Sequence, residues 1–354
     1  MTTSPSLYDA SIDDLNALMG GQPAYRVKQV WQALYEQFRP VTEITTIPAA
    51  LRAELDTALP ESLVWKTEQT DATGETVKFL WHLRDGGHPI ETVLMLYPDR
   101  ATVCVSTQAG CAMACGFCAT GQAGFNRHLS TGEIVEQVVK AARRAREIGR
   151  RVSNIVFMGM GEPLANEAAT RGAVKRIHDD IGISARHLTV STVGIIPGIQ
   201  KLAEWPLPVN LAVSLHAARN DLRNELVPIN KRYPIEDLVE ACNDYLRERR
   251  RRVSFEWALI DRVNDTRRDA NELALLCKRL SPHAHVNIIP LNPTPGWPTR
   301  GSSPARVREF ADALIDLGVN ATVRRNRGTD IDAACGQLAA GQSITPVTLG
   351  RSDS

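Results

Sequence analysis

Apolar residues recur at helical spacing through the first part of the chain. Over 25–35 they stand three or four positions apart, and the same spacing returns over 48–58, so we expect helices within 11–57. Between 64 and 97 the pattern changes to alternation, in VKFLWHL and ETVLML, around a glycine-containing turn at 84–87. Alternation of period two on both sides of such a turn predicts a β-hairpin.

From residue 101 onward the pattern becomes strand, loop and helix, repeated. A capping box, Ser130 with Glu133, predicts a helix running to about 149, and a further helix is expected over 304–317. This alternation predicts an α/β fold with a parallel sheet, and about six repeats suit an incomplete (β/α)6 TIM-like barrel. In such barrels the chemistry lies on loops at the carboxyl ends of the strands. The strands are expected near 101–107, 152–158, 187–193, 210–215, 253–260, 285–290 and 320–325.

These patterns divide the chain into four predicted segments. They are a small helical domain over 1–63, a hairpin extension over 64–100, the partial barrel over 101–338, and a mobile tail over 339–354. A chain of 354 residues is long enough for one large α/β domain with an appendage.

Composition narrows the class of protein. With 43% hydrophobic and 23% charged residues the chain is typical of a globular protein, and no apolar run approaches the roughly 20 residues that span a bilayer. The polar N-terminus does not resemble a signal peptide, so a cytoplasmic location without membrane association is expected. A net charge of +1 argues against general polyanion binding. Arginines do cluster locally, and we interpret 247–252 as a solvated helix end and 324–327 as a functional group.

Three cysteines, Cys111, Cys115 and Cys118, form a CxxxCxxC triplet. Three thiolates at this spacing hold three irons of a [4Fe–4S] cluster and leave the fourth iron open. Structural zinc would need a fourth ligand, and the nearest histidine, His128, lies outside the usual spacings. The triplet is typical of radical S-adenosylmethionine (SAM) enzymes, in which the open iron binds SAM and reduction cleaves it to a 5′-deoxyadenosyl radical.

Polar or glycine-rich segments follow several predicted strands. They are MGMGEP at 158–163, STVG at 191–194, SLH at 214–216 and NP at 292–293. A dinucleotide-binding GxGxxG reading fails because Leu164 occupies the third glycine position. As consecutive strand ends of one barrel, these segments predict a pocket mouth lined for a cofactor.

Segments spread over nearly the whole chain resemble the RlmN/Cfr family of radical-SAM RNA methyltransferases, and most of all its RlmN members. The matching segments are the 25–35 helix, GCAMACGFCATGQAGFNR (110–127), MGMGEPL (158–164), STVGIIPGI (191–199), LAVSLHA (211–217) and RGTDIDAACGQL (327–338). The resemblance implies a radical-SAM partial barrel whose N-terminal helical domain, 1–63, binds RNA. It assigns the cluster to Cys111, Cys115 and Cys118, and SAM binding to Gly161, Glu162, Ser191, Ser214, Leu215, His216 and Asn292.

The same resemblance implies three catalytic residues and a reaction. Cys335 takes a methyl group from one SAM, a second SAM supplies the radical that activates that methyl, and the methylene joins C2 of an adenine. Glu91 accepts a proton, and Cys104 attacks Cys335 to release the methylated base and leave a disulfide, which a reductant then resets. The implied partners are 23S rRNA, before ribosome assembly is complete, and tRNA, with flavodoxin or ferredoxin as electron donor to a monomeric enzyme.

Three other interpretations stay open at this point. They are Cfr-type methylation at C8 of the same rRNA adenosine, a different radical-SAM reaction on a protein substrate, and an iron–sulfur RNA-binding or sensor protein. The second leaves Cys104 and Cys335 without a role. Cys242 and Cys277 lie within amphipathic helices and are expected to be small core residues.

Overall fold

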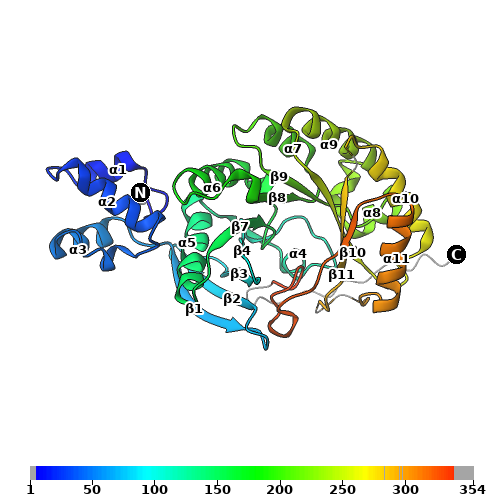
Figure 1. The fold of residues 1–354 in the computed structure, drawn as a ribbon, viewed down its shortest axis with the longest axis horizontal. Helices are drawn as coiled ribbons and strands as arrows, with labels where there is room; N and C mark the ends of the chain where they lie inside the picture. The colour runs from blue at the N-terminus through cyan, green and yellow to red at the C-terminus, as the bar shows by residue number, and fades with distance from the viewer. Residues whose placement is uncertain (1–4, 283, 295, 297, 339–354) are drawn as a thin grey trace.

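The computed structural model describes residues 5–282, 284–294, 296 and 298–338, so the predicted tail at 339–354 lies outside the described residues. The chain begins with helices α1 (Ile12–Leu18), α2 (Ala24–Tyr35) and α3 (Ala49–Ala58), with the 3-10 turn η1 (Val41–Glu43) before α3. Figure 1 shows these helices grouped to one side of the rest of the molecule. The helices expected within 11–57 are thus confirmed. Ser11 opens α1 with a capping box, in which its side chain accepts from the Asp14 backbone N–H.

An antiparallel extension follows the helices, and it is larger than the sequence predicted. Strands β2 (Thr76–Leu83) and β3 (Ile90–Leu96) form the expected hairpin, but β1 (Leu63–Thr70) pairs with β2 as a third strand. Most of β1 is exposed, so it lacks the alternation that marks a half-buried strand. The extension does not stand apart, because β3 pairs antiparallel with β4 (Ala101–Cys104) at the start of the parallel sheet.

The parallel part of the sheet is a partial barrel, as predicted. After β4 come, side by side and all parallel, strands β7 (Val152–Phe157), β8 (Leu188–Thr192), β9 (Asn210–Ser214), β10 (Val253–Leu259), β11 (His285–Pro290) and β12 (Ala321–Val323). Helices connect successive strands and cover the outside of the curved sheet (Figure 1). They are α5 (Thr131–Glu147), α6 (Glu167–Asp179), α7 (Ile196–Glu204), α8 (Asn220–Leu226), α9 (Ile235–Arg249), α10 (Arg267–Lys278) and α11 (Pro304–Asp316).

Short elements decorate the strand ends. Between β4 and α5 the chain forms β5 (Gln108–Gly110), helix α4 (Ala119–Ala123) and β6 (Phe125–His128), and β5 pairs antiparallel with β6. The loops also carry 3-10 turns η2 (Pro163–Asn166), η3 (Ala185–His187), η4 (Pro228–Lys231) and η5 (Thr329–Ile331). The α5 capping box at Ser130 and Glu133 forms as the sequence predicts.

Polar contacts fix the N-terminal helices to the outer helices of the barrel. The Trp31 indole N–H donates to Asp180 at 3.2 Å, and Arg176 donates to the Tyr35 hydroxyl at 2.6 Å. A buried carboxylate on α5, that of Glu136, accepts from the backbone N–H groups of Ser62 and Leu63 at 2.8 and 3.1 Å. These contacts anchor the turn into β1, and with it the antiparallel extension, against α5.

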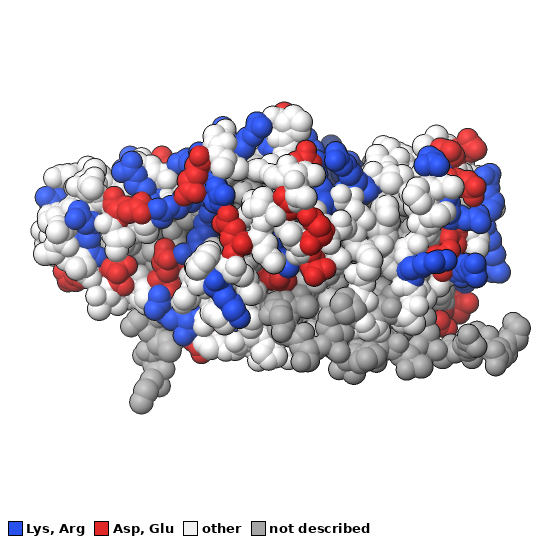
Figure 2. Space-filling view, turned by 90° about the horizontal axis from the view of Figure 1, so that it is seen from below, with Lys and Arg blue, Asp and Glu red and all other residues white. Residues whose placement is uncertain are grey.

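The surface carries both signs of charge. On the face that Figure 2 shows, acidic and basic side chains are interspersed, as the net charge of +1 suggests. The arginines at 247–252 lie at the end of α9, where Arg247 and Arg249 fall in the last turn and Arg250 is the C-cap. Cations there interact favourably with the helix dipole, which supports the helix-end interpretation. In the described part of the chain, no helix has the length and apolar character that a membrane crossing requires.

Candidate active site

A single pocket at the carboxyl edge of the barrel brings together most of the residues that the sequence singled out. It also includes hydrophobic residues of β3, Glu256 of β10 and the polar residues 324–327 that follow β12. Glu91 and Leu215 are predicted site residues that do not line it. Those that do are Cys104, Cys111, Cys115, Cys118, Gly161, Glu162, Ser191, Ser214, His216, Asn292 and Cys335.

The cysteine triplet lies on a tight loop between β5 and α4, where backbone contacts hold it. The Cys111 N–H donates to the Gly124 carbonyl at 2.8 Å, and the Cys118 N–H donates to the Cys115 carbonyl at 3.1 Å. At Gly121 a Cβ would fall 2.8 Å from the Cys115 carbonyl oxygen, so a larger residue would displace the loop. The three thiols are therefore held at one end of the pocket.

The donor set fits a [4Fe–4S] cluster. Burial raises the pKa of all three thiols, that of Cys111 to about 12, and neighbouring thiolate charge raises the pKa of Cys115 further. Buried thiolates so close together need a cation, and soft sulfur donors favour iron–sulfur clusters. Within the described residues no three acidic, histidine or cysteine side chains converge on one point as ligands of a single ion would. A cluster makes no such demand, because each thiolate binds a different iron.

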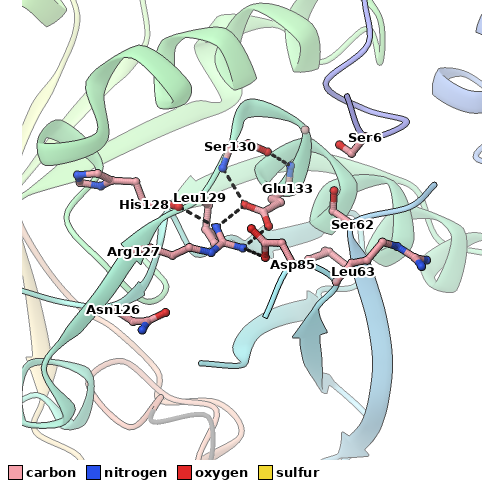
Figure 3. A network of polar contacts seen from close by, with 12 residues as sticks. Ser6, Ser62, Leu63, Asp85, Asn126, Arg127, His128, Leu129, Ser130 and Glu133 are labelled. Carbon is pink, nitrogen blue, oxygen red and sulfur yellow. Dashed lines mark hydrogen bonds and ion pairs between the residues drawn. The ribbon is translucent and has the colours of Figure 1, made fainter. Parts of the chain in front are cut away.

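A network of polar contacts ties this loop to the antiparallel extension (Figure 3). Arg127, on β6, lies 2.6 Å from Asp85 in the β2–β3 turn and 2.6 Å from Glu133 at the start of α5. Glu133 in turn accepts from the Ser130 backbone N–H at 2.8 Å. The strand that leaves the cluster loop is thereby fixed to two neighbouring elements.

The predicted SAM residues after β7 are held rigidly. Gly161 has a φ of 102°, and a Cβ there would lie 2.6 Å from the Gln108 Cβ. The Glu162 carboxylate accepts from the backbone N–H groups of Leu164 at 3.0 Å and Val193 at 2.8 Å. Burial raises the pKa of Glu162 to about 7, although the hydrogen bonds from these two N–H groups act to lower that pKa. Glu162 therefore links two strand-end loops as well as facing the pocket.

His216 faces the pocket as a neutral ring. Its Nδ1 accepts from the Ala258 backbone N–H at 2.9 Å, so the ring proton resides on Nε2. Burial, with the nearby Arg223 charge, lowers the pKa of His216 to about 3. The ring packs edge-to-face on Phe117 at 4.8 Å, next to the cluster loop.

Leu215 is placed differently from its neighbours Ser214 and His216. Its side chain belongs to the main hydrophobic core, and its backbone N–H and carbonyl are bonded to the Glu256 carbonyl and the Arg223 side chain, both at 3.1 Å. Alternation along the strand end turns the two polar side chains toward the pocket and the leucine away. Its predicted role in SAM binding stays a prediction.

Asn292 connects the pocket to the segment that carries Cys335. Its amide N–H donates to the Cys335 carbonyl at 3.1 Å, and its amide oxygen accepts from Asn326 at 2.7 Å. The Ala119 N–H, at the start of α4, donates to the Gly336 carbonyl at 2.7 Å. The Cys335 segment is thus held against both the cluster loop and the strand-end loops.

Cys104 and Cys335 are both free thiols that line the pocket. Burial raises the pKa of Cys104 to about 12, and the charge of Cys335 acts in the same direction. Arg324, which also lines the pocket, is the nearby cation, and the Cys335 thiolate charge raises the pKa of its guanidinium.

Glu91 is buried beside the pocket instead of lining it. It lies on β3 two residues before Val93, which does line the pocket and pairs directly with Cys104 of β4. Its carboxylate forms an ion pair with Lys78 of β2 at 3.1 Å. Glu91 therefore shares with Val93 the side of β3 that faces the pocket.

Arg223 is the main residue that the sequence did not reveal. It is fully buried on α8 and donates to the carbonyls of Val193 at 2.6 Å, Ser214 at 3.2 Å and Leu215 at 3.1 Å. It therefore joins the loops after β8 and β9. A lone arginine in a polar stretch gives no sequence signal, because only the folded chain brings these carbonyls together.

The arginines at 324–327, which the sequence analysis interpreted as a functional group, have different surroundings. Arg324, Arg325 and Arg327 all line the pocket. Arg327 also donates to Glu75 at 2.8 Å and to the Leu96 carbonyl at 3.0 Å and is only 11% exposed. Arg327 thus joins the Cys335 segment to the antiparallel extension. Arg325 is 75% exposed.

Comparison with known proteins agrees with this geometry. The model of the Radical SAM superfamily matches residues 105–277. A protein of Chloroflexus aurantiacus named "Probable dual-specificity RNA methyltransferase RlmN" is 48% identical over 96% of this chain and 93% of its own length. A protein of the same name from Frankia casuarinae is 52% identical over 94% of this chain and 81% of its own length.

A solved structure shows the same fold. The crystal structure of a radical SAM methyltransferase from Sphaerobacter thermophilus is 50% identical, covers 95% of this chain and 99% of its own, and superposes with a TM-score of 0.91. With the cysteine triplet, the pocket at the carboxyl edge and relatives about 50% identical over nearly the whole chain, the chain belongs to the RlmN family of radical-SAM methyltransferases.

Proposed function

We propose that this chain methylates C2 of adenosine in 23S rRNA and in tRNA through a methylated Cys335. The observation that carries the proposal is that Cys335 and Cys104 line the same pocket as the three cluster cysteines. The printed name of the relatives, a dual-specificity RNA methyltransferase, supports RNA as the substrate class. Adenine C2 is electron-poor and does not attack SAM directly, so an intermediate carrier of the methyl group is needed.

Cys335 is the proposed carrier. Its thiolate attacks the methyl carbon of a first SAM, a sulfur–carbon bond forms on Cys335, and the sulfonium bond breaks to release S-adenosylhomocysteine. Arg324 lines the same pocket and places a positive charge near Cys335. The Asn292 amide holds the Cys335 carbonyl, which fixes the direction of the thiol.

Cys111, Cys115 and Cys118 would hold the [4Fe–4S] cluster, which when bound supplies the electron that cleaves a second SAM. The chain's own part is to seat that SAM. Gly161 lines the pocket, and the polar groups of Ser191, Ser214 and His216 face the same space. The Nε2–H of His216 is a donor held in one orientation by the bond to its Nδ1.

Glu91 and Cys104 would complete the reaction. Once the carbon on Cys335 is bonded to C2, the Glu91 carboxylate takes the C2 proton. The adduct gives up one electron, the counterpart of the one spent in cleaving SAM. The Cys104 thiolate attacks the Cys335 sulfur, the bond from Cys335 to carbon breaks with its electron pair on the carbon, and that carbon takes up a proton to become the methyl group. The methylated base leaves, and a Cys104–Cys335 disulfide remains. An external dithiol reduces that disulfide before the next turnover.

The adenine must reach the pocket edge-on, so an unstacked or flipped-out nucleotide is the expected substrate. The helical segment 1–63 and the exposed Arg325 are the proposed RNA contacts, beside an extension at 64–100 and a catalytic barrel at 101–338. We place the enzyme in the reducing cytoplasm, as a monomer that receives electrons from flavodoxin or ferredoxin and modifies 23S rRNA before ribosome assembly is complete.

The decisive experiment measures the mass of the tryptic peptide 328–351, whose only cysteine is Cys335. Cluster-loaded protein is incubated anaerobically with SAM, beside a Cys335→Ala control. A gain of one CH₂ on Cys335 supports the proposal, and an unmodified peptide in protein that binds SAM refutes it. Digestion of treated RNA then distinguishes 2-methyladenosine from the 8-methyladenosine of Cfr-type chemistry.

A further inference from the structure

The segment that carries Cys335 rests on the antiparallel extension. The Ala72 N–H, in the β1–β2 turn, donates to the Asp330 carboxylate at 2.9 Å. At Gly328, where φ is 63°, a Cβ would lie 2.9 Å from the Thr76 Cγ2 of β2. The backbone of the 328–335 segment therefore packs directly against strand β2, which we call the β2 platform.

One side chain of that platform reaches two functional elements. The Lys78 ammonium lies 3.1 Å from a Glu91 carboxylate oxygen and donates to the Asp332 carbonyl at 3.4 Å. The two paired side chains are 10% and 5% exposed. A buried ammonium at this position thus touches both the proposed proton acceptor and the segment that presents the methyl group.

The register of the strands explains this reach. Lys78 of β2 pairs with Val93 of β3, and Val93 pairs with Cys104 of β4, so these three side chains form one row across the sheet. Directly paired side chains project to the same face, and Glu91, two residues from Val93, projects there too. Lys78 therefore stands on the pocket side of the sheet, in the row that contains Cys104.

Resting on the proposed function, we propose that Lys78 is a positioning residue that fixes the Glu91 carboxylate relative to the Cys335 segment for the proton-removal step. Lys78 forms and breaks no covalent bond. The proton passes from adenine C2 to a Glu91 oxygen, and Lys78 keeps that oxygen pointed toward the base that Cys335 holds. The Cys335 segment has other anchors, at Asp330 and Gly336, so its methylation does not depend on Lys78.

The test separates the two halves of the reaction. Lys78→Met removes the ammonium but keeps an unbranched side chain, and Lys201→Met, on the exposed outer surface of α7, is the matched control. Each variant is loaded with cluster and assayed for CH₂ on the 328–351 peptide, for covalent RNA–protein adduct by denaturing gel, and for 2-methyladenosine. Glu91→Gln and the double variant Lys78→Met/Glu91→Gln complete a cycle.

Lys78→Met is expected to methylate Cys335 as wild type does, to accumulate adduct, and to form 2-methyladenosine about 10- to 100-fold more slowly. The double variant should be no slower than Glu91→Gln alone, because Lys78 acts through Glu91. The double variant also removes both charges of this pair, so it reads out the coupling even if Lys78→Met folds poorly.

Two results would overturn the positioning role. One is a Lys78→Met enzyme that turns over like Lys201→Met with no adduct, and the other is a double variant whose losses multiply. A purely structural ion pair would lower the yield of Cys335 methylation and of product together, without adduct. If wild-type protein places no CH₂ on Cys335, the proposed function itself fails, and that outcome is distinct from either.

Discussion

Replacing Arg223 by methionine should destabilise the protein by about 2 kcal/mol, because it leaves three acceptors without this donor. They are the Val193 and Ser214 carbonyls and the Asn230 side chain, whereas the Leu215 carbonyl still accepts from the Ala217 N–H at 2.8 Å. Arg223 bonds three backbone carbonyls and the Asn230 side chain, at 2.6 to 3.2 Å, with no exposed surface of its own. Burial is the main cause that lowers its pKa, from 12.5 to about 10, which corresponds to a desolvation cost of about 3 kcal/mol.

The net change in the free energy of unfolding is the cost of the unpaired acceptors minus the desolvation cost that is no longer incurred. Acceptors left unpaired cost about 1–3 kcal/mol each, which gives about 5 kcal/mol for three groups toward the lower end of that range. Removing the buried charge returns about 3 kcal/mol of desolvation, so about 2 kcal/mol of destabilisation remains. Two of the abandoned carbonyls belong to Val193 and Ser214, which line the pocket, so SAM affinity should fall as well.

Urea titration of the cluster-free protein measures the free energy of unfolding, and SAM binding is measured on cluster-loaded protein. The matched control is Arg219→Met, which removes ion pairs to Asp269 and Glu272 from a side chain that is 29% exposed. Partly exposed pairs contribute about 1 kcal/mol or less. Equal losses in the two variants would show that the buried hydrogen bonds of Arg223 do not hold the strand ends together.

Three further predictions test the pocket. Gly161→Ala should cost about 1–3 kcal/mol more than Gly182→Ala, because both glycines have positive φ but only the first Cβ would clash, and thermal unfolding with SAM titration checks this. Burial holds the pKa of Glu162 at about 7 against 4.5 when exposed, so the folded state binds the extra proton and stability should fall as pH rises from about 4.5 to 7. Glu162→Gln should flatten this part of the stability profile of cluster-free protein, and an unchanged slope would contradict the assignment. Asn292→Ala releases the Cys335 carbonyl and should slow CH₂ transfer to that thiol by about 10- to 100-fold, followed by peptide mass against time.

The sequence predicted the parts of the site that follow directly from local pattern. The spacing of Cys111, Cys115 and Cys118 indicates their chemistry. The segments at 158–163 and 214–216 follow strands whose apolar runs are clear in the sequence. Because parallel strands end at one edge, residues distant in sequence could be expected to meet there.

The features that the sequence did not reveal all depend on contacts between residues distant along the chain. Strand β1 is mostly exposed, so its pairing with β2 rather than any alternation makes it a strand. The sequence assigns Arg327 to a functional group of arginines but does not reveal its partners, because only the folded chain brings Glu75 and the Leu96 carbonyl to it. The same holds for Arg223, whose acceptors come from two different strand ends.

The antiparallel extension can be understood from the geometry of an incomplete barrel. A sheet that runs from β4 to β12 does not close on itself, so the pocket would be open along the gap between its two edges. Strand β3 extends the sheet beyond β4. The segment after β12 crosses to contact the β1–β2 turn, through Arg327 with Glu75, and β2, through Asp332 with Lys78.

The segment that spans this gap also carries Cys335. The segment that closes the side of the pocket therefore also presents the methyl carrier, because the contacts that hold this segment in place also hold Cys335. Releasing Arg327 from Glu75 should consequently loosen the segment that carries Cys335, whereas Lys78 acts on Glu91, although β2 itself contributes no residue to the pocket lining. Strand β2 thus belongs to the functional architecture as much as the strand ends that face the cofactor.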